Sequence, residues 1–191
     1  MNMNVTTIDE TLQAAIRLAS GGSASLRELD ELPAPIYLTD PAGTVTYFNR
    51  ACVAFAGRTP VVGVDSWCVT WKLFTEEGTF LPHDQCPMAV AIKEKRPVRG
   101  VEAIAERPDG TRVRFRPYPT PLIDEEGRLG GALNMLIGLP DRAQIEFLHK
   151  QAQRCSRLAA STSDERTATT LATMALEYGE EARRLERIGA N

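Results

Sequence analysis

The strongest constraint on the fold lies in residues 98–138, which contain three strand-like runs joined by two short turns. The first turn, in "RPDGTRV", holds Asp109-Gly110, and glycine accepts the positive φ that a tight hairpin turn needs. The second turn, "DEEGRL", has similar chemistry. In the middle run Val113 and Phe115 alternate with arginines, which indicates one buried face and one solvated face. Together these features predict three antiparallel strands in a row.

The middle run, "TRVRFRPYPTPLI", also contains Pro117, Pro119 and Pro121. Proline cannot donate to a strand ladder, so this run is predicted to lie at an edge or to contain a bulge. Two further β-rich runs, "IYLTD" from Ile36 and "TVTYFN", are separated by the turn sequence "DPAGT". The intervening residues 50–95 are interpreted as irregular and helical.

Helices are predicted on both sides of these strands. A short helix is expected from Ile8 to Leu18, followed by the flexible joint "SGGSAS". After Pro140 the strand signals stop, and Asp141 is placed to cap a helix that runs to about Ala160. A second helix follows "STSDE", and the two apolar stripes predict a helical hairpin. We therefore divide the chain into residues 1–28, 29–142 and 143–191.

Composition excludes several classes of protein. The net charge is −3 and the pI is about 5.5, which gives no support to nucleic-acid binding. The longest apolar run, residues 130–139, is too short to span a membrane, and the first residues lack the pattern of a signal peptide. The 4 cysteines form no CxxC pair and are expected to be free thiols in a cytoplasmic protein. Common catalytic motifs are not found, so an enzyme is not predicted.

Three stretches carry a resemblance to a known family. "LPAPIYLTDPAGTVTYFNRACVAFAG", "DGTFLPHDQCPMAVAIKEKRPVRGVE" and "ERPDGTRVRFRPYPTPLIDEEGRLGGALNMLIGLPDR" resemble, in this order, the opening, middle and last three strands of a PAS domain. The resemblance covers roughly residues 29–142. It implies an α+β fold, in which a five-stranded antiparallel sheet has helices over one face and encloses a small cavity or a solid core. The N-terminal helix and the C-terminal α-hairpin are additions to that domain.

PAS domains sense ligands, bind heme or flavin, or act as dimerisation and interaction modules, and most feed a catalytic or DNA-binding output domain. Only about 49 residues follow residue 142 here, too few for a catalytic output domain. The resemblance therefore implies a non-enzymatic sensory protein of bacterial type. Its signal would leave through the helical tail or through a separate signalling partner, without nucleic acid or membrane.

The segment "PHDQCPMAVAIKEKRP" has two interpretations. In the first, it is an ordinary helix start: Pro87 suits the first turn, Asp84 or Gln85 satisfies free helix N–H groups, and Cys86 is a small apolar residue. In the second, His83 and Cys86 bind heme or a metal, with Cys68 as a third ligand. No fourth ligand is evident, so the first interpretation leads and the cofactor is left undetermined. No stretch matches the flavin-adduct cysteine motif of light-sensing PAS domains.

Candidate cavity residues are chosen by apolar character, because ligand sites are mostly apolar with a few polar groups. Asn134, the polar member of the last strand, is the candidate for orienting a ligand, with a solvent-facing position as the alternative. Trp67 and Trp71, four residues apart, would lie on one face if their stretch is helical, and such tryptophans belong more often to the core than to a ligand site. The apolar candidates are Trp67, Trp71, Phe80, Met88, Ile92, Val113 and Phe115.

These observations lead to three hypotheses on function. In the leading one, a small ligand changes the packing between sheet and helix, and the change alters how the tail helix leaves the last strand. The alternatives are an interaction module with a solid core and a heme or metal redox sensor. A void of roughly 300 Å³ or more favours the first over the second. A homodimer through the tail is expected, and its contact residues are predicted to be Leu148, Leu171, Tyr178 and Leu185.

Overall fold

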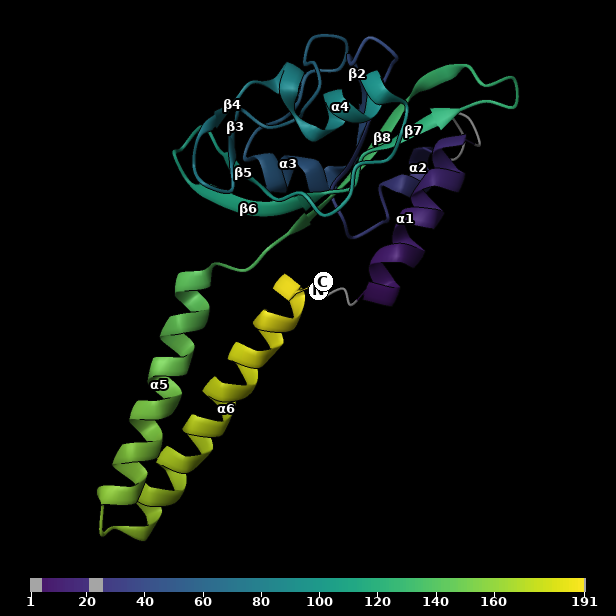
Figure 1. The fold of residues 1–191 in the computed structure, drawn as a ribbon. Coiled ribbons are helices and arrows are strands. Elements are labelled where there is room, and N and C mark those ends of the chain that lie inside the picture. Colours follow the sequence, from purple (N-terminus) through teal and green to yellow (C-terminus); the bar gives the residue numbers. More distant parts are fainter. Residues whose placement is uncertain (1–4, 21–25, 191) are drawn as a thin grey trace. The chain divides into compact units, whose positions relative to one another are not determined.

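The computed structural model describes residues 5–20 and 26–190, and these form two compact units. The first unit comprises Val5–Gly138 and the second begins at Leu139. The first contains the strands and the helices α1 to α4, whereas the second contains the helices α5 and α6 (Figure 1).

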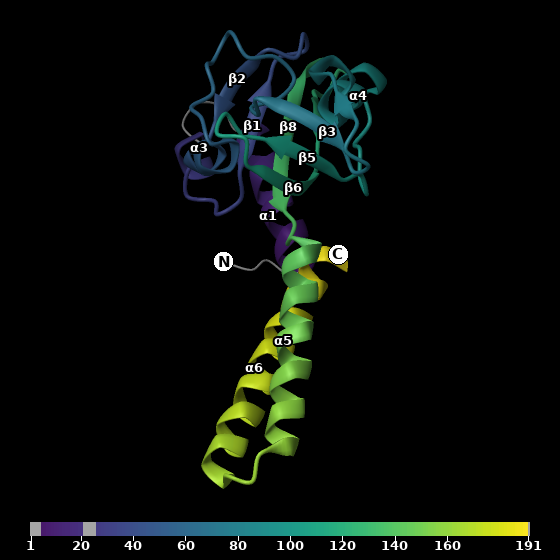
Figure 2. The same ribbon diagram turned by 90° about the vertical axis from the view of Figure 1, so that its left-hand side faces the viewer.

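The strands of the first unit form one antiparallel sheet, seen from the side in Figure 2. Their order is β2-β1-β8-β6-β5-β3-β4, and β7 pairs with β8 beside β6. The strands are β1 (Ile36–Thr39), β2 (Val45–Phe48), β3 (Lys72–Thr75), β4 (Phe80–Leu81), β5 (Ala103–Glu106), β6 (Arg112–Pro117), β7 (Thr120–Ile123) and β8 (Leu129–Gly138).

Each of the five predicted strand runs contains a strand, and the proline-rich run contains two. The run is divided after Pro117 into β6 and β7, and between them the Tyr118 N–H donates to the Met135 carbonyl oxygen of β8 at 2.8 Å. Among the described residues β7 pairs with β8 alone, and its register shifts between Leu122 and Ile123. The predicted edge and bulge are therefore confirmed. The interpretation of residues 50–95 was wrong in part, since they include the hairpin of β3 and β4.

Helices α3 (Arg50–Ala56) and α4 (Pro87–Glu94) bury apolar side chains against one face of the sheet. The shared core includes Tyr37 of β1, Phe55 of α3, Met88 of α4 and Phe115 of β6, and the rings of Phe55 and Phe115 meet edge to face at 5.2 Å. This layer corresponds to the helices that the sequence placed over one face of the sheet.

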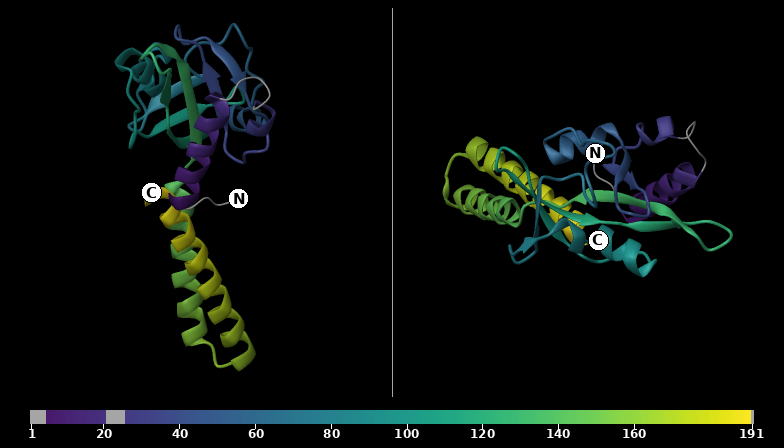
Figure 3. Two further views of the ribbon diagram at one scale, coloured as in Figure 1. Left: turned by 90° about the vertical axis from the view of Figure 1, so that its right-hand side faces the viewer. Right: turned by 90° about the horizontal axis from the view of Figure 1, so that it is seen from above.

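The opposite face of β8 packs against the N-terminal helices. Side chains alternate along a strand, so Leu133 and Met135 point away from the core that contains Ala132 and Leu136. Helix α1 (Val5–Ser20) contacts β8 and the short helix α2 (Leu26–Leu29), and it buries Ile8, Leu12 and Ala15 (Figure 3). Helix α1 extends three residues before and two residues beyond the predicted span of 8–18.

The second unit is the predicted helical hairpin. Helix α5 (Arg142–Ser161) is capped as expected, because the Asp141 carboxylate accepts a hydrogen bond from the Ala143 N–H at 2.9 Å. Helix α6 (Glu165–Ala190) is capped by Asp164, whose carboxylate accepts from the Thr167 N–H at 2.8 Å. Along the described helices, no stretch is long and apolar enough to cross a bilayer.

Candidate functional site

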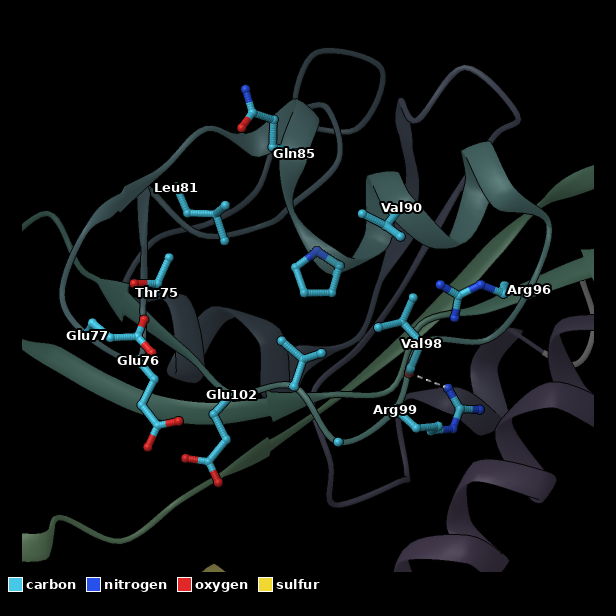
Figure 4. Close-up of a pocket in the computed structure, with 13 residues that line it drawn as sticks. Thr75, Glu76, Glu77, Leu81, Gln85, Val90, Arg96, Val98, Arg99 and Glu102 are labelled. Atoms are coloured by element: carbon cyan, nitrogen blue, oxygen red, sulfur yellow. Dashed lines mark hydrogen bonds between the residues drawn. The ribbon is translucent and has the colours of Figure 1, made fainter.

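The first unit contains an open pocket of about 580 Å³ beside helix α4. Its walls come from three neighbouring segments of the stretch 75–102: the β3–β4 turn, the beginning of α4, and the loop that connects α4 to β5 (Figure 4). Five apolar side chains contribute to the lining, namely Leu81, Pro87, Val90, Val98 and Val101. The pocket has a size typical of sites for small molecules, and its lining combines these apolar side chains with seven polar or charged ones.

The charged side chains of the pocket wall already have partners. Glu102 forms ion pairs of 2.7 Å with both Arg114 and Arg116 on the neighbouring strand. Arg96 pairs with Glu94 at 2.5 Å. These pairs satisfy part of the charge in the wall, so the pocket offers a ligand both apolar and polar surface.

The loop between α4 and β5 is tied to the junction of β6 and β7. The Val98 N–H donates to the carbonyl oxygen of Pro119 at 3.2 Å. The Arg99 guanidinium donates to the same oxygen at 2.8 Å and to the Thr120 hydroxyl oxygen at 2.8 Å, and its bond to the Val98 carbonyl is drawn in Figure 4. This pocket wall is therefore hydrogen-bonded to the segment that joins β6 to β7, two strands that both pair with β8.

The predicted cavity residues do not line this pocket. Met88, Ile92 and Phe115 are buried in the core between helices and sheet, where they contact other apolar side chains. Trp71 and Phe80 are 46% and 57% exposed, respectively, on or beside the β3–β4 hairpin.

Trp67 and Val113 are partly buried and pack against the same core. Trp67 adopts a left-handed backbone conformation with φ of 66°, and its ring covers Gly43 so closely that a Cβ there would lie 2.3 Å from it. This arrangement gives Trp67 a packing role that its spacing from Trp71 does not reveal. The two tryptophans do not form the helical pair considered from the sequence, because neither lies in a helix.

Asn134 of β8 points into the core, one of the two positions that the sequence allowed. There its side chain bonds to β1 and to a residue between β6 and β7. Its Oδ1 accepts from the Tyr118 N–H at 3.0 Å, and its Nδ2 donates to the Tyr37 hydroxyl oxygen at 3.0 Å. The Tyr37 hydroxyl in turn donates to the Trp67 carbonyl at 2.9 Å. Burial raises the pKa of Tyr37 well above its usual value, so the hydroxyl keeps its proton. Asn134 therefore holds the sheet to its covering loop.

The segment 82–97 begins a helix, as the leading interpretation predicted, with Pro87 at its first position. Cys86, rather than Asp84 or Gln85, is the residue that precedes the helix, and its side chain makes no capping hydrogen bond. His83 lies in a short 3₁₀ turn, and burial together with the nearby Arg58 lowers its pKa.

Cys86 has the environment of a structural thiol. It is buried, and its Sγ lies 3.8 Å from the Trp67 carbonyl oxygen. Burial raises the pKa of the thiol to about 12, although the start of a helix would by itself favour the thiolate. Cys68, the third ligand of the metal hypothesis, is also buried, and its Sγ lies 3.1 Å from the Thr70 hydroxyl. Within the described ranges, no group of three or more His, Cys, Asp or Glu side chains is arranged to hold a metal ion.

A labelling experiment tests this description of Cys86. Because the thiolate is the reactive form, we expect brief iodoacetamide treatment at pH 8 to leave Cys86 unmodified in the native protein and to modify it in urea. Peptide mass spectrometry would report the two extents of modification. Rapid labelling of Cys86 in the native protein would contradict a buried, protonated thiol.

The residues predicted for dimerisation lie within the helical hairpin. Leu148 on α5 and Leu171, Tyr178 and Leu185 on α6 are partly buried, at the spacing of the seam between the two helices. Their apolar surface is therefore used at least in part inside one chain.

The pocket itself was missed by the sequence analysis. Its signal is weak: Val98 and Val101 are two apolar residues in the otherwise charged stretch "KEKRPVRGVE", which begins at Lys93 in the last turn of α4. At that end Lys95 adopts a left-handed conformation, with φ of 50°, and the chain turns back over the helix. A polar stretch that contains isolated valines after a helix is thus the only hint that the sequence offers.

Comparison with solved structures finds LOV and PAS domains. The RsLOV d2 variant is 16% identical, with 85% of this chain and 94% of that chain covered and a TM-score of 0.48. A LOV protein of Rhodobacter sphaeroides is 12% identical, with coverages of 94% and 98% and a TM-score of 0.45. The PAS domain of an HTR-like protein from Haloarcula marismortui is 18% identical, with coverages of 66% and 98% and a TM-score of 0.43. No protein-family model and no curated protein sequence matches the chain.

The observed architecture has the order that the sequence resemblance implies. Two strands are followed by a segment that contains α3, the β3–β4 hairpin and α4, and then by the antiparallel strands β5 to β8, and α3 and α4 cover one face of the sheet. The first unit of the chain is a PAS-like domain.

Proposed function

We propose that this protein is a non-enzymatic, cytoplasmic sensory module that binds a small molecule in the pocket beside α4. The observation that carries the proposal is the pocket itself, whose volume of about 580 Å³ lies within the range of small-molecule sites of roughly 300 to 1,000 Å³. Its five apolar side chains and the ion pairs of Arg96 and Glu102 support a ligand that is held in part by burial of apolar surface.

The output of the sensor is proposed to pass through the helical tail to a signalling partner, with the protein acting as a homodimer. The loop that lines the pocket is bonded to Pro119 and Thr120, and β7 pairs with β8, which the chain follows into α5. A ligand that prefers one position of this loop would shift the population of strand positions at β8.

Filling the pocket tests the proposal. In a screen of small neutral molecules against the full chain by ¹H–¹⁵N NMR, we expect binders to shift the amides of Val90, Val98 and Val101. Val90→Trp should weaken their binding by about tenfold or more, because the indole occupies the ligand's volume. Val62→Trp is the matched control, since Val62 is 52% exposed and lies outside the pocket.

Two results would contradict the proposal in different ways. Binding that persists unchanged in the Val90→Trp variant would exclude this pocket as the site. Binding without any change in hydrogen exchange at the beginning of α5 would keep the site and exclude the relay.

A further inference from the structure

The helical hairpin buries little apolar surface for its length. Between Arg142 and Arg187 the buried residues with side chains are Cys155 and Ala182, both small. Long helices gain most of their stability from packing of an amphipathic face, and units of this size rarely build a sufficient core alone. Leu176 on α6, meanwhile, is 64% exposed. The helical hairpin thus buries few apolar side chains and at the same time exposes the apolar side chain of Leu176.

One side of the hairpin is hollowed next to this exposed leucine. A groove of about 650 Å³ runs between the two helices, and Ala159 and Ala160 of α5 line it together with Ala168, Ala172 and Leu176 of α6. Small side chains permit close approach of another helix, and Leu176 projects at the edge of the same groove. On this face the projecting side chain of Leu176 therefore lies next to the groove.

This pairing of shapes fits a second copy of the chain. In a twofold interface the same surface serves both partners, so residue i contacts residue j and the reverse. We propose that two hairpins pack through this groove into a four-helix bundle, with Leu176 of each copy inserted between the alanines of the other. The inference rests on the homodimer of the proposed function and assigns its contact surface to this face instead of to the seam inside each hairpin.

The charged side chains of α6 support a second copy of the chain as the occupant of the groove. Beyond Leu176 the surface of α6 carries acidic and basic side chains in similar number, among them Glu180, Arg183 and Arg187. A surface that mixes both signs does not repel its own copy, whereas a single-sign surface would select a partner of opposite charge. Because the charges begin where the alanines end, the proposed contact lies at the end of the hairpin near the α5–α6 turn.

Sedimentation velocity of the full chain tests the proposal. The wild type is expected to be a dimer, and Leu176→Glu should raise the dimer dissociation constant by at least about 30-fold, as loss of a central anchor does. Leu158→Glu is the matched control. Leu158 is also exposed, at 45%, but it is two positions from Ala160 and therefore about 200° away from it around α5. We expect this variant to stay dimeric.

Cysteine variants test the same contact, so the result does not depend on whether the Leu176→Glu variant folds. A short thiol-specific crosslinker should join Ala172→Cys variants between two chains, because Ala172 lines the proposed contact, and should join Thr173→Cys variants far less, because Thr173 lies about 100° away from Ala172 around α6. A monomeric wild type, or dissociation by Leu158→Glu and not by Leu176→Glu, would overturn the proposal. Small-molecule binding in the pocket reports the proposed function separately, since it is measured at residues of the other unit.

Discussion

Replacing Gly131 by alanine is expected to destabilise the first unit by about 4 kcal/mol or more, among the largest effects of a single methyl group. Gly131 has φ of 141°, a conformation that other residues adopt only with strain. An added Cβ would lie 2.0 Å from the Thr39 carbonyl oxygen in β1. Because that neighbour is backbone, the clash can be relieved only if β8 moves away from β1.

The adjacent glycine is the control for this prediction. A Cβ at Gly130 would meet its nearest atom, the Leu122 carbonyl oxygen, at the ordinary distance of 3.6 Å, and we expect Gly130→Ala to change stability by less than about 1 kcal/mol. Urea unfolding followed by tryptophan fluorescence would report this unit alone, because both tryptophans of the chain belong to it. Equal midpoints for the two variants would contradict the described contact between β8 and β1.

Asn49→Ala is expected to cost about 3 to 5 kcal/mol, because one fully buried side chain makes four hydrogen bonds. Its Oδ1 accepts from the N–H groups of Ile36 at 3.0 Å and Cys52 at 3.3 Å. Its Nδ2 donates to the carbonyl oxygens of Leu29 at 3.1 Å and Ala34 at 2.8 Å. The alanine variant would leave these backbone groups buried without partners, at the point where α3, β1 and the N-terminal segment meet.

Asp141→Ala provides the comparison, since Asp141 also caps a helix but is exposed. Loss of that cap should cost only about 1 kcal/mol, and it should affect the second unit rather than the first. Urea unfolding by circular dichroism and by tryptophan fluorescence would separate the two units. A cost below about 1 kcal/mol for Asn49→Ala would mean that water replaces the lost bonds and that the site is less enclosed than described.

Most of the fold could be predicted because its signals are local. Asp109-Gly110 and the alternation around Val113 and Phe115 specify a hairpin regardless of the rest of the chain, and the strands follow that prediction. The hairpin of β3 and β4 was missed although "LFTEEGTFL" contains a comparable signal. Gly78 has φ of 86° in its turn, between two short aromatic runs. The alternating pattern of two short strands covers few residues, so the pattern of the surrounding residues dominates the prediction.

The candidate site could be predicted far less well, because a pocket depends on how the segments around it pack in three dimensions, which the order of residues does not show. Apolar side chains such as Met88 and Phe115 look alike in sequence whether they line a void or fill it, and here they fill it. Phe80 shows the opposite failure: its ring contacts Phe74 across the hairpin at 5.9 Å and remains mostly exposed. The pocket lies instead between the β3–β4 turn, the beginning of α4 and the loop after α4, whose side chains do not fill the space between them.

The central claim is that the pocket beside α4 holds a small molecule, and native mass spectrometry of the freshly purified chain tests it most directly. An ultraviolet–visible spectrum of the same sample would show whether the molecule is coloured. We predict excess bound mass in the wild type and in Val62→Trp, none in Val90→Trp, and no heme or flavin band. A heme or flavin band, or excess mass that Val90→Trp retains, would contradict the account and place the ligand elsewhere.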